Sequence, residues 1–203
     1  MTTATQQTTD RWLDTASGRR VNLTKPAPES IAVEDIAGAL SRICRFGGHT
    51  SEFYSVAQHS VLVANMIAHF GRSDLRLVAL HHDSHEAYLG DMPTPLKKRL
   101  RDMDQYFGYA QLVEALDLAI SRALGIPHPT PGDEEVLLRA DRAALQMEAR
   151  LLLPNNGADV IRDDDYEAMS SLPHCPSPWS PSEAARRFIT LHRSLVGTAL
   201  AAS

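Results

Sequence analysis

The sequence predicts an all-α fold on three observations. Apolar residues recur at helical spacing in most segments, glycines and prolines separate those segments, and very few stretches alternate as strands do. The chain has 203 residues, 43% of them hydrophobic and 22% charged, which is enough to bury a core in one domain. We therefore expect a compact helical bundle with a small N-terminal hairpin.

The N-terminal segment is expected to lie outside the bundle. Residues 1–9 are polar and have the composition of a disordered tail. The stretch RWLDTASGRRVNL alternates weakly around Ser17 and Gly18, which predicts a small hairpin, and the prolines of TKPAPES predict a linker. We assign residues 1–29 to the tail, hairpin and linker, and residues 30–203 to the main domain.

Roughly six helices are expected in the main domain. The first runs from Val33 to about Arg45, where RFGGHTS breaks it. The next three cover 55–70, 74–90 and 105–124, with DMPTPLK (91–97) as a rigid loop. A fifth covers 133–153 and is followed by a polar loop that includes RDDD at 162–165. The last opens with Ser180 as N-cap, Pro181 in the first turn and Glu183 as a capping-box acid.

Composition argues against several classes of function. The net charge is −5 and no basic stripe is present, which argues against a nucleic-acid polymer as partner. The polar N-terminus does not resemble a signal peptide, and no apolar run approaches the ~20 residues of a membrane span. Cys44 and Cys175 form no CxxC pair, so we expect reduced thiols rather than a disulfide, in a cytoplasmic protein.

Metal-binding residue types concentrate in HHDSHEAYLGDMPTPLK. On a continuous helix Glu86 would share a face with His82 and Asp83, because it lies four and three positions beyond them. His59 and Asp141 interrupt two other apolar helical patterns. Each alone has a structural explanation, as a core histidine or an exposed acid. Together, in the order H…HD…D, they indicate a divalent-metal site.

With these residues the sequence resembles the HD-domain metal-dependent phosphohydrolases, in particular the small bacterial and phage 5′-deoxynucleotidases of the YfbR and YfdR type. The resemblance rests on LSRICRFGGHTSEFYSVAQHS, HHDSHEAYLGDMPTPLK and ADRAALQMEARLL, and covers about residues 30–153. It implies that His59, His82, Asp83 and Asp141 bind one divalent cation, with Mn, Co, Mg, Zn and Fe all open. It also implies a nucleotide substrate and a homo-oligomer, a dimer or larger.

The same resemblance implies roles for five further residues. Glu86 matches the catalytic carboxylate of these enzymes, and Asp91 matches an acid near the substrate sugar. Arg45 and Phe46 match an Arg-Trp pair that holds phosphate and base, across a one-residue gap. Phenylalanine keeps a stacking face there but lacks the indole N–H. Lys97 lies where a cation meets phosphate.

The chemistry is consistent with these assignments. Two imidazoles and two carboxylates form a mixed N/O site for a cation that lowers the pKa of a bound water, while Arg and Lys hold the phosphate. Other activities stay open: hydrolysis of deoxynucleoside di- or triphosphates, a di-iron oxygenase of this fold, or a regulator that binds nucleotides without catalysis. An oxygenase needs more histidine ligands between the HD doublet and Asp141, where only His85 and His128 lie. A regulator would lack some ligands or Glu86.

Neighbouring polar residues have simpler expected roles. His81 is expected in the core or behind the ligands, His85 beside the site, and Glu148 as a surface charge. His49 is either a substrate contact or exposed. The remaining histidines of loops and the last helix are expected to be structural or exposed: His128, His174 and His192.

Overall fold

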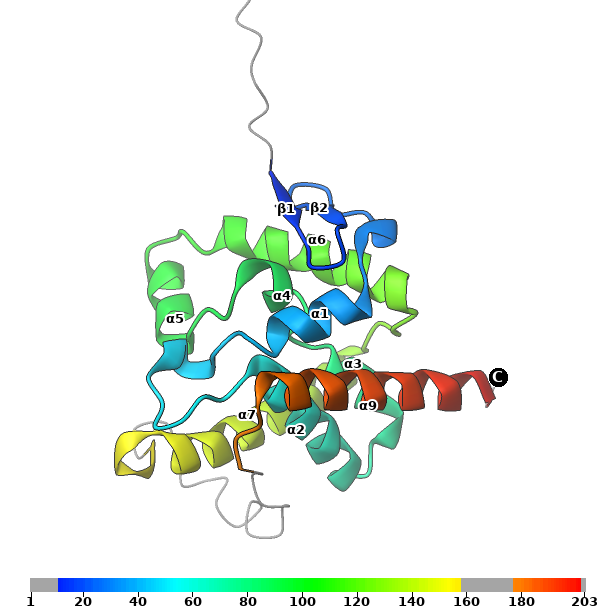
Figure 1. The fold of residues 1–203 in the computed structure, drawn as a ribbon. Coiled ribbons are helices and arrows are strands. Elements are labelled where there is room, and N and C mark those ends of the chain that lie inside the picture. Colours follow the sequence, from blue (N-terminus) through cyan, green and yellow to red (C-terminus); the bar gives the residue numbers. More distant parts are fainter. Residues whose placement is uncertain (1–10, 158–176, 202–203) are drawn as a thin grey trace, which may run out of the picture.

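A computed structural model describes residues 11–157 and 177–201 and confirms the all-α class (Figure 1). Helices make up the bundle, and the described strands form one small antiparallel hairpin at the N-terminal end. The expected tail, the RDDD segment, His174 and Cys175 lie outside the described residues. Within the two described ranges, no helix combines the length and apolar character needed to cross a membrane.

The hairpin forms where the sequence predicts it. Strand β1 (Trp12–Asp14) pairs with β2 (Arg20–Asn22), with Leu13 opposite Val21. Val21 is fully buried in the core. The carboxylate of Asp35 accepts hydrogen bonds from the backbone N–H and hydroxyl of Ser17, at 2.8 and 2.6 Å. The hairpin is therefore attached to the bundle through both apolar and polar contacts.

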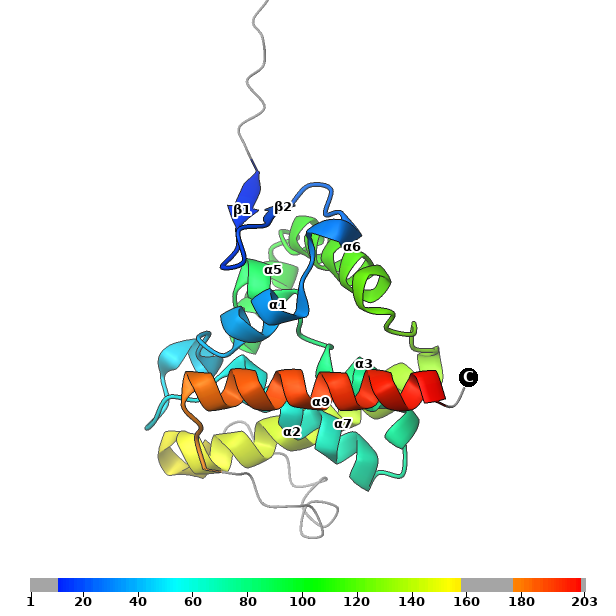
Figure 2. The ribbon, with the colours of Figure 1, turned by 45° about the vertical axis from the view of Figure 1, so that its right-hand side comes forward.

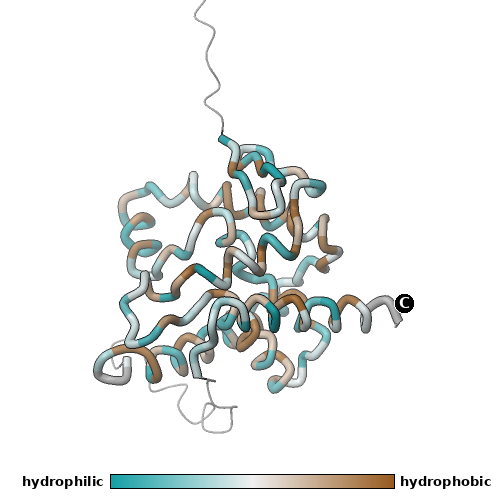
Figure 3. Tube along the Cα trace, in the orientation of Figure 1, coloured by the Kyte–Doolittle hydropathy of each residue, from teal (hydrophilic) through white to brown (hydrophobic). Residues whose placement is uncertain are grey.

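Helix α2 (Val56–His69) is the central element. Nearly all of its residues are buried, because α3 (Arg76–Leu80), α7 (Pro131–Leu152) and α9 (Pro181–Ala201) pack around it. Figure 2 shows α9 lying across α2. Along α9, apolar and polar residues alternate at short intervals (Figure 3), as expected of a helix that buries one face.

The first helix of the bundle is shorter than predicted. Helix α1 (Val33–Leu40) ends before residue 45, because the chain from Ile43 to Arg45 pairs instead with residues 54–56. Cys44 bridges Ser55, and the Arg45 N–H donates to Tyr54 O at 2.9 Å. The remaining segments are η1 (Pro28–Ser30), η2 (Arg45–Gly48), η3 (Ser73–Leu75), α4 (Glu86–Leu89), α5 (Thr94–Asp102), α6 (Phe107–Leu124) and η4 (Pro154–Gly157).

The prediction of one helix over 74–90 is wrong. The chain leaves α3 after Leu80, forms a turn over 81–85, and resumes as the short helix α4. Side chains compete with helical hydrogen bonds here: His82 Nδ1 contacts Ala79 O at 2.8 Å, and His81 Nδ1 contacts Ser84 Oγ at 2.8 Å. The turn, not a helical face, therefore presents His82 and Asp83.

The expected loop over 91–97 is also partly helical. Helix α5 begins at Thr94, so both prolines lie at its start, at its N-cap and in its first turn. Proline is tolerated there, since the first N–H groups of a helix have no intrahelical partner. The prolines predicted a break, and they mark the beginning of a helix.

Candidate metal centre

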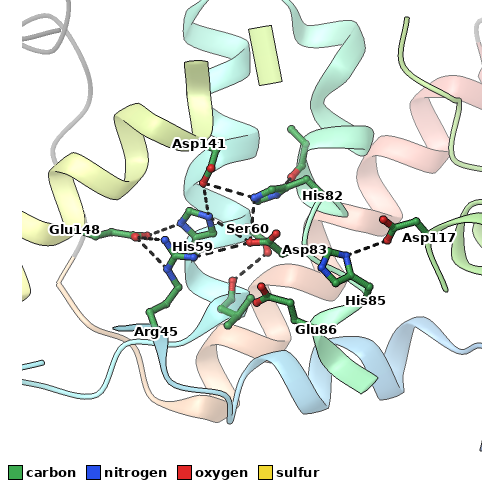
Figure 4. A network of polar contacts seen from close by, with 12 residues as sticks. Arg45, His59, Ser60, His82, Asp83, His85, Glu86, Asp117, Asp141 and Glu148 are labelled. Carbon is green, nitrogen blue, oxygen red and sulfur yellow. Dashed lines mark hydrogen bonds and ion pairs between the residues drawn. The ribbon is translucent and has the colours of Figure 1, made fainter. Parts of the chain in front are cut away.

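Three separate elements bring four predicted ligands together (Figure 4). His59 comes from the middle of α2 and is fully buried, Asp141 comes from the middle of α7, and the turn after α3 supplies His82 and Asp83. Their convergence from positions so far apart in the sequence is the main feature of the site.

The distances among the four donor atoms suit a single ion. His59 Nε2 lies 3.1 Å from Asp141 Oδ1 and 3.7 Å from Asp83 Oδ2. His82 Nε2 lies 3.2 Å from Asp83 Oδ2 and 3.8 Å from Asp141 Oδ1. Donors about 2.1 Å from one ion are about 3.0 Å apart at about 90°, and about 3.8 Å apart at about 130°. These donors can therefore share one divalent cation.

In both histidines a hydrogen bond fixes the Nδ1 atom, which directs Nε2 toward the other ligands. His82 Nδ1 must donate to Ala79 O, because a carbonyl only accepts. His59 Nδ1 lies 2.8 Å from Glu148 Oε1 and donates to that carboxylate. Both Nε2 atoms are buried and make no well-aligned hydrogen bond. This is the arrangement in which a histidine offers its Nε2 lone pair to a metal.

The electrostatics also favour a cation. Burial raises the pKa of Asp83, but His82 and His59 outweigh it, so the pKa lies well below the usual range. Burial likewise raises the pKa of Asp141, and the nearby imidazoles of His59 and His82 lower it well below normal. Burial lowers the pKa of His82, and Asp83 and Asp141 raise it well above normal. The two ionised carboxylates thus favour positive charge at this point, which a protonated imidazole or a divalent cation can supply.

Glu148 was expected at the surface, and that prediction is wrong. Its side chain is fully buried. Besides His59, it binds Arg45, whose Nη2 and Nε donate to Oε2 at 3.0 and 3.2 Å. The sequence carried a signal for this position, since a residue seven beyond Asp141 lies on the same face of α7. A buried carboxylate between two cationic groups is a structural partner of the centre.

Arg45 reaches the centre as well. Its Nη1 lies 3.9 Å from Asp83 Oδ2, and its guanidinium lies 5.6 Å from the centre of the Phe46 ring. Burial lowers the pKa of Arg45, but Glu148 and the two carboxylates of the centre raise it above its ordinary value. Phe46 itself has φ 55° and ψ 27°, a left-handed conformation that is rare for a bulky residue.

Glu86 and Lys97 form an ion pair beside the centre. Lys97 Nζ lies 3.6 Å from Glu86 Oε1, while Oε2 is buried without a hydrogen-bond partner. Burial, and then the nearby Asp83 and Asp91, raises the pKa of Glu86 to about 9. Burial also raises the pKa of Asp91, with Arg45 opposing. Glu86 and Asp91 therefore lie within the electrostatic reach of the centre.

The other histidines divide into buried and exposed groups. His85 Nδ1 lies 3.1 Å from Asp117 Oδ1, a partner that sequence patterns did not indicate. His81 Nε2 lies 2.9 Å from His192 Nδ1, so His192 is a buried structural residue. His49 and His128 are exposed.

A cavity of about 590 Å³ adjoins the centre on the His82 side, between α3, α6 and the start of α7. Its wall is largely apolar, with Val78 and Ile120 among its residues, and it also contains Asp117 and Tyr106. The described residues that line it include no arginine or lysine. Three carboxylates line it, those of Glu114, Asp117 and Glu134, so the cavity disfavours a phosphate.

Two curated proteins are similar to this chain. The uncharacterized protein YfdR of Escherichia coli is 36% identical over 141 residues, which is 68% of this chain and 74% of YfdR. An uncharacterized protein of Rhodobacter capsulatus is 38% identical over 157 residues, which is 74% of this chain and 78% of that protein. No family model matches the chain. The identity and coverage show that the chain belongs to the same protein family as YfdR.

Proposed function

We propose that this protein is a divalent-metal-dependent phosphohydrolase of the HD-domain type, which releases phosphate from deoxynucleoside 5′-monophosphates. The observation that carries the proposal is the convergence of His59, His82, Asp83 and Asp141, with each histidine Nε2 3.1–3.8 Å from an oxygen of each aspartate. The buried network of polar contacts around them extends to an arginine, which gives the site a group for binding phosphate.

Each residue has a role that follows from its position. The four donors hold the cation, which when bound polarises the phosphate and lowers the pKa of a water. Arg45, 3.9 Å from Asp83, offers N–H groups to the phosphate oxygens. Lys97 adds a second cation on the Glu86 side. Phosphate transfer depends mainly on such positioning and charge stabilisation.

Glu86 is proposed as the catalytic carboxyl group. Its burial keeps the carboxyl able to exchange a proton close to neutral pH, as a general acid or base requires. Its Oε2 is free of protein partners, so it can bind the attacking water or the leaving oxygen of the sugar.

The same surroundings favour a nucleoside monophosphate. Arg45 and Lys97 provide two positive charges, which match a monophosphate dianion better than the larger charge of a triphosphate. We assign to Asp91, whose carboxyl lies within the electrostatic reach of Arg45 and Asp83, the role of accepting a hydrogen bond from a sugar hydroxyl. The Phe46 ring offers an apolar face to the base or sugar.

A panel assay tests the proposal. Chelator-treated protein is reloaded with Mn²⁺, Co²⁺, Mg²⁺ or Zn²⁺ and incubated with deoxy- and ribonucleoside mono-, di- and triphosphates. We expect phosphate release to be fastest from deoxynucleoside monophosphates, and to disappear with chelator and in Asp83→Ala. Release of triphosphate or pyrophosphate would show that nucleoside triphosphates are the substrates instead. No phosphate release from any substrate with any metal would refute the proposal.

A further inference from the structure

A second cluster of ligand-type side chains lies beside the first and includes one of its members. Asp83, His85 and Glu86 each offer a ligand atom, and these atoms lie within 4.8 Å of one another. His85 and Glu86 are buried, with 7% and 1% of their surface exposed. The proposed function uses Glu86 alone and gives His85 no role.

Each of the three side chains is held through one atom and has another left over. His85 Nδ1 contacts Asp117 Oδ1 at 3.1 Å, which leaves Nε2. Glu86 Oε1 contacts Lys97 Nζ at 3.6 Å, which leaves Oε2. Asp83 directs Oδ2 to the first group of ligands, which leaves Oδ1. Each of the three side chains therefore has one ligand atom that these contacts do not engage, and His85 and Glu86 are buried.

Two of these contacts have the form found around bound metals. A carboxylate that accepts a hydrogen bond from one ring nitrogen of a histidine fixes the tautomer and orients the other nitrogen toward a metal. Asp117 contacts His85 Nδ1 in this way, which orients Nε2. Glu86 Oε2 is buried and has no hydrogen-bond partner, although buried carboxylate oxygens are nearly always paired. A cation at this point would satisfy that oxygen.

We propose that Asp83, His85 and Glu86 bind a second divalent cation, with Asp83 bridging it to the first. One imidazole and two carboxylates form a harder ligand set than the first site, so Mn²⁺ or Mg²⁺ fits it better than Zn²⁺. Ions that share a bridging ligand in two-metal sites lie about 3.5–4 Å apart, close enough to bind one phosphate together. This deepens the proposed function and rests on it: the role given above to Glu86 Oε2 is that of the chain with one ion, and with two ions the same oxygen would hold the second cation.

Manganese binding tests the second site without any assay of activity. Chelator-treated protein is dialysed against increasing Mn²⁺, bound metal is measured by atomic emission, and the loaded protein is examined by electron paramagnetic resonance. We expect two ions per chain, and the closely spaced hyperfine lines of an exchange-coupled pair. His85→Ala and Glu86→Gln should each bind one ion, with the spectrum of isolated Mn²⁺. His69→Ala, which removes an exposed histidine at the end of α2, should still bind two.

The outcomes separate this inference from the proposed function. One ion per wild-type chain up to millimolar Mn²⁺, or two ions retained by His85→Ala, would overturn the second site. If the wild-type protein still released phosphate after either of these results, the proposed function would stand. Two coupled ions without phosphate release would instead overturn the function and keep the site. Circular dichroism checks that each variant is folded, and Glu86→Gln decides the question if His85→Ala is not.

Discussion

Replacing Glu148 with glutamine tests how much this buried carboxylate stabilises the fold and orients His59. The wild-type carboxylate accepts from His59 Nδ1 at 2.8 Å and from Arg45 Nη2 and Nε at 3.0 and 3.2 Å. Glutamine has nearly the same size, but one end of its amide is a donor. In either orientation that NH₂ group faces the N–H of His59 or of Arg45, so either the His59 hydrogen bond or both Arg45 hydrogen bonds are lost.

The contacts set the size of the effect. Removing one partner of a buried ion pair destabilises a protein by about 3–5 kcal/mol. Because Asp83 still lies 3.9 Å from Arg45, we take the lower end, about 3 kcal/mol. Loss of the group that orients a ligating histidine weakens metal binding by about 10–100-fold. That corresponds to about 1.4–2.8 kcal/mol of binding free energy.

Two measurements check the Glu148→Gln prediction. Urea unfolding of the chelator-treated protein gives the change in unfolding free energy, and competition with a chromophoric chelator gives the affinity for Co²⁺. Glu135→Gln is the matched control, since it makes the same change at an exposed position of the same helix. Equal unfolding midpoints and equal Co²⁺ affinities in the two variants would refute the supporting role of Glu148.

Three further predictions concern catalysis, specificity and acid stability. Glu86→Ala should keep the ion held by the four donors but lower kcat by about a hundredfold or more; loss of that ion with the activity would make Glu86 one of its ligands. Asp91→Asn should lower kcat/KM and reduce the preference for deoxyribonucleotides; equal wild-type kcat/KM for a deoxynucleotide and its ribonucleotide would exclude this role. Hydrogen bonds from Thr130 and Arg72 lower the pKa of Asp133 to about 2 from 3.8. Their stabilisation is complete above pH 3.8 and is lost as the pH falls through about 2, so the stability difference from Asp133→Asn should shrink over that range in urea unfolding.

The sequence predicted the elements that obey local rules. Helices α2 and α7 have long apolar patterns, and the hairpin turns at Ser17 and Gly18, so neighbouring residues determine them. The grouping of His59 with Asp141 was predicted from the order H…HD…D and the resemblance that it carries, since each residue alone has a structural explanation. These features required no knowledge of which helices touch.

Side-chain hydrogen bonds within a turn, and contacts between distant segments, decided what the sequence did not predict. The break after Leu80 follows from the hydrogen bonds that the His81 and His82 side chains make within the turn, where the local pattern is helical. Glu148 looked like a surface charge because its partner Arg45 lies about a hundred residues away in the chain. Such pairings become visible only once α7 packs against α2.

The left-handed backbone at Phe46 has a consequence for how this position can vary. Phenylalanine disfavours that conformation by about 1–2 kcal/mol, whereas glycine adopts it freely and asparagine tolerates it well. Selection for thermal stability alone would therefore tend to replace Phe46 with one of these residues and lose its ring beside Arg45. Under the proposed function, the ring at this strained position would be an example of the trade-off between stability and activity, in which a binding residue weakens the fold.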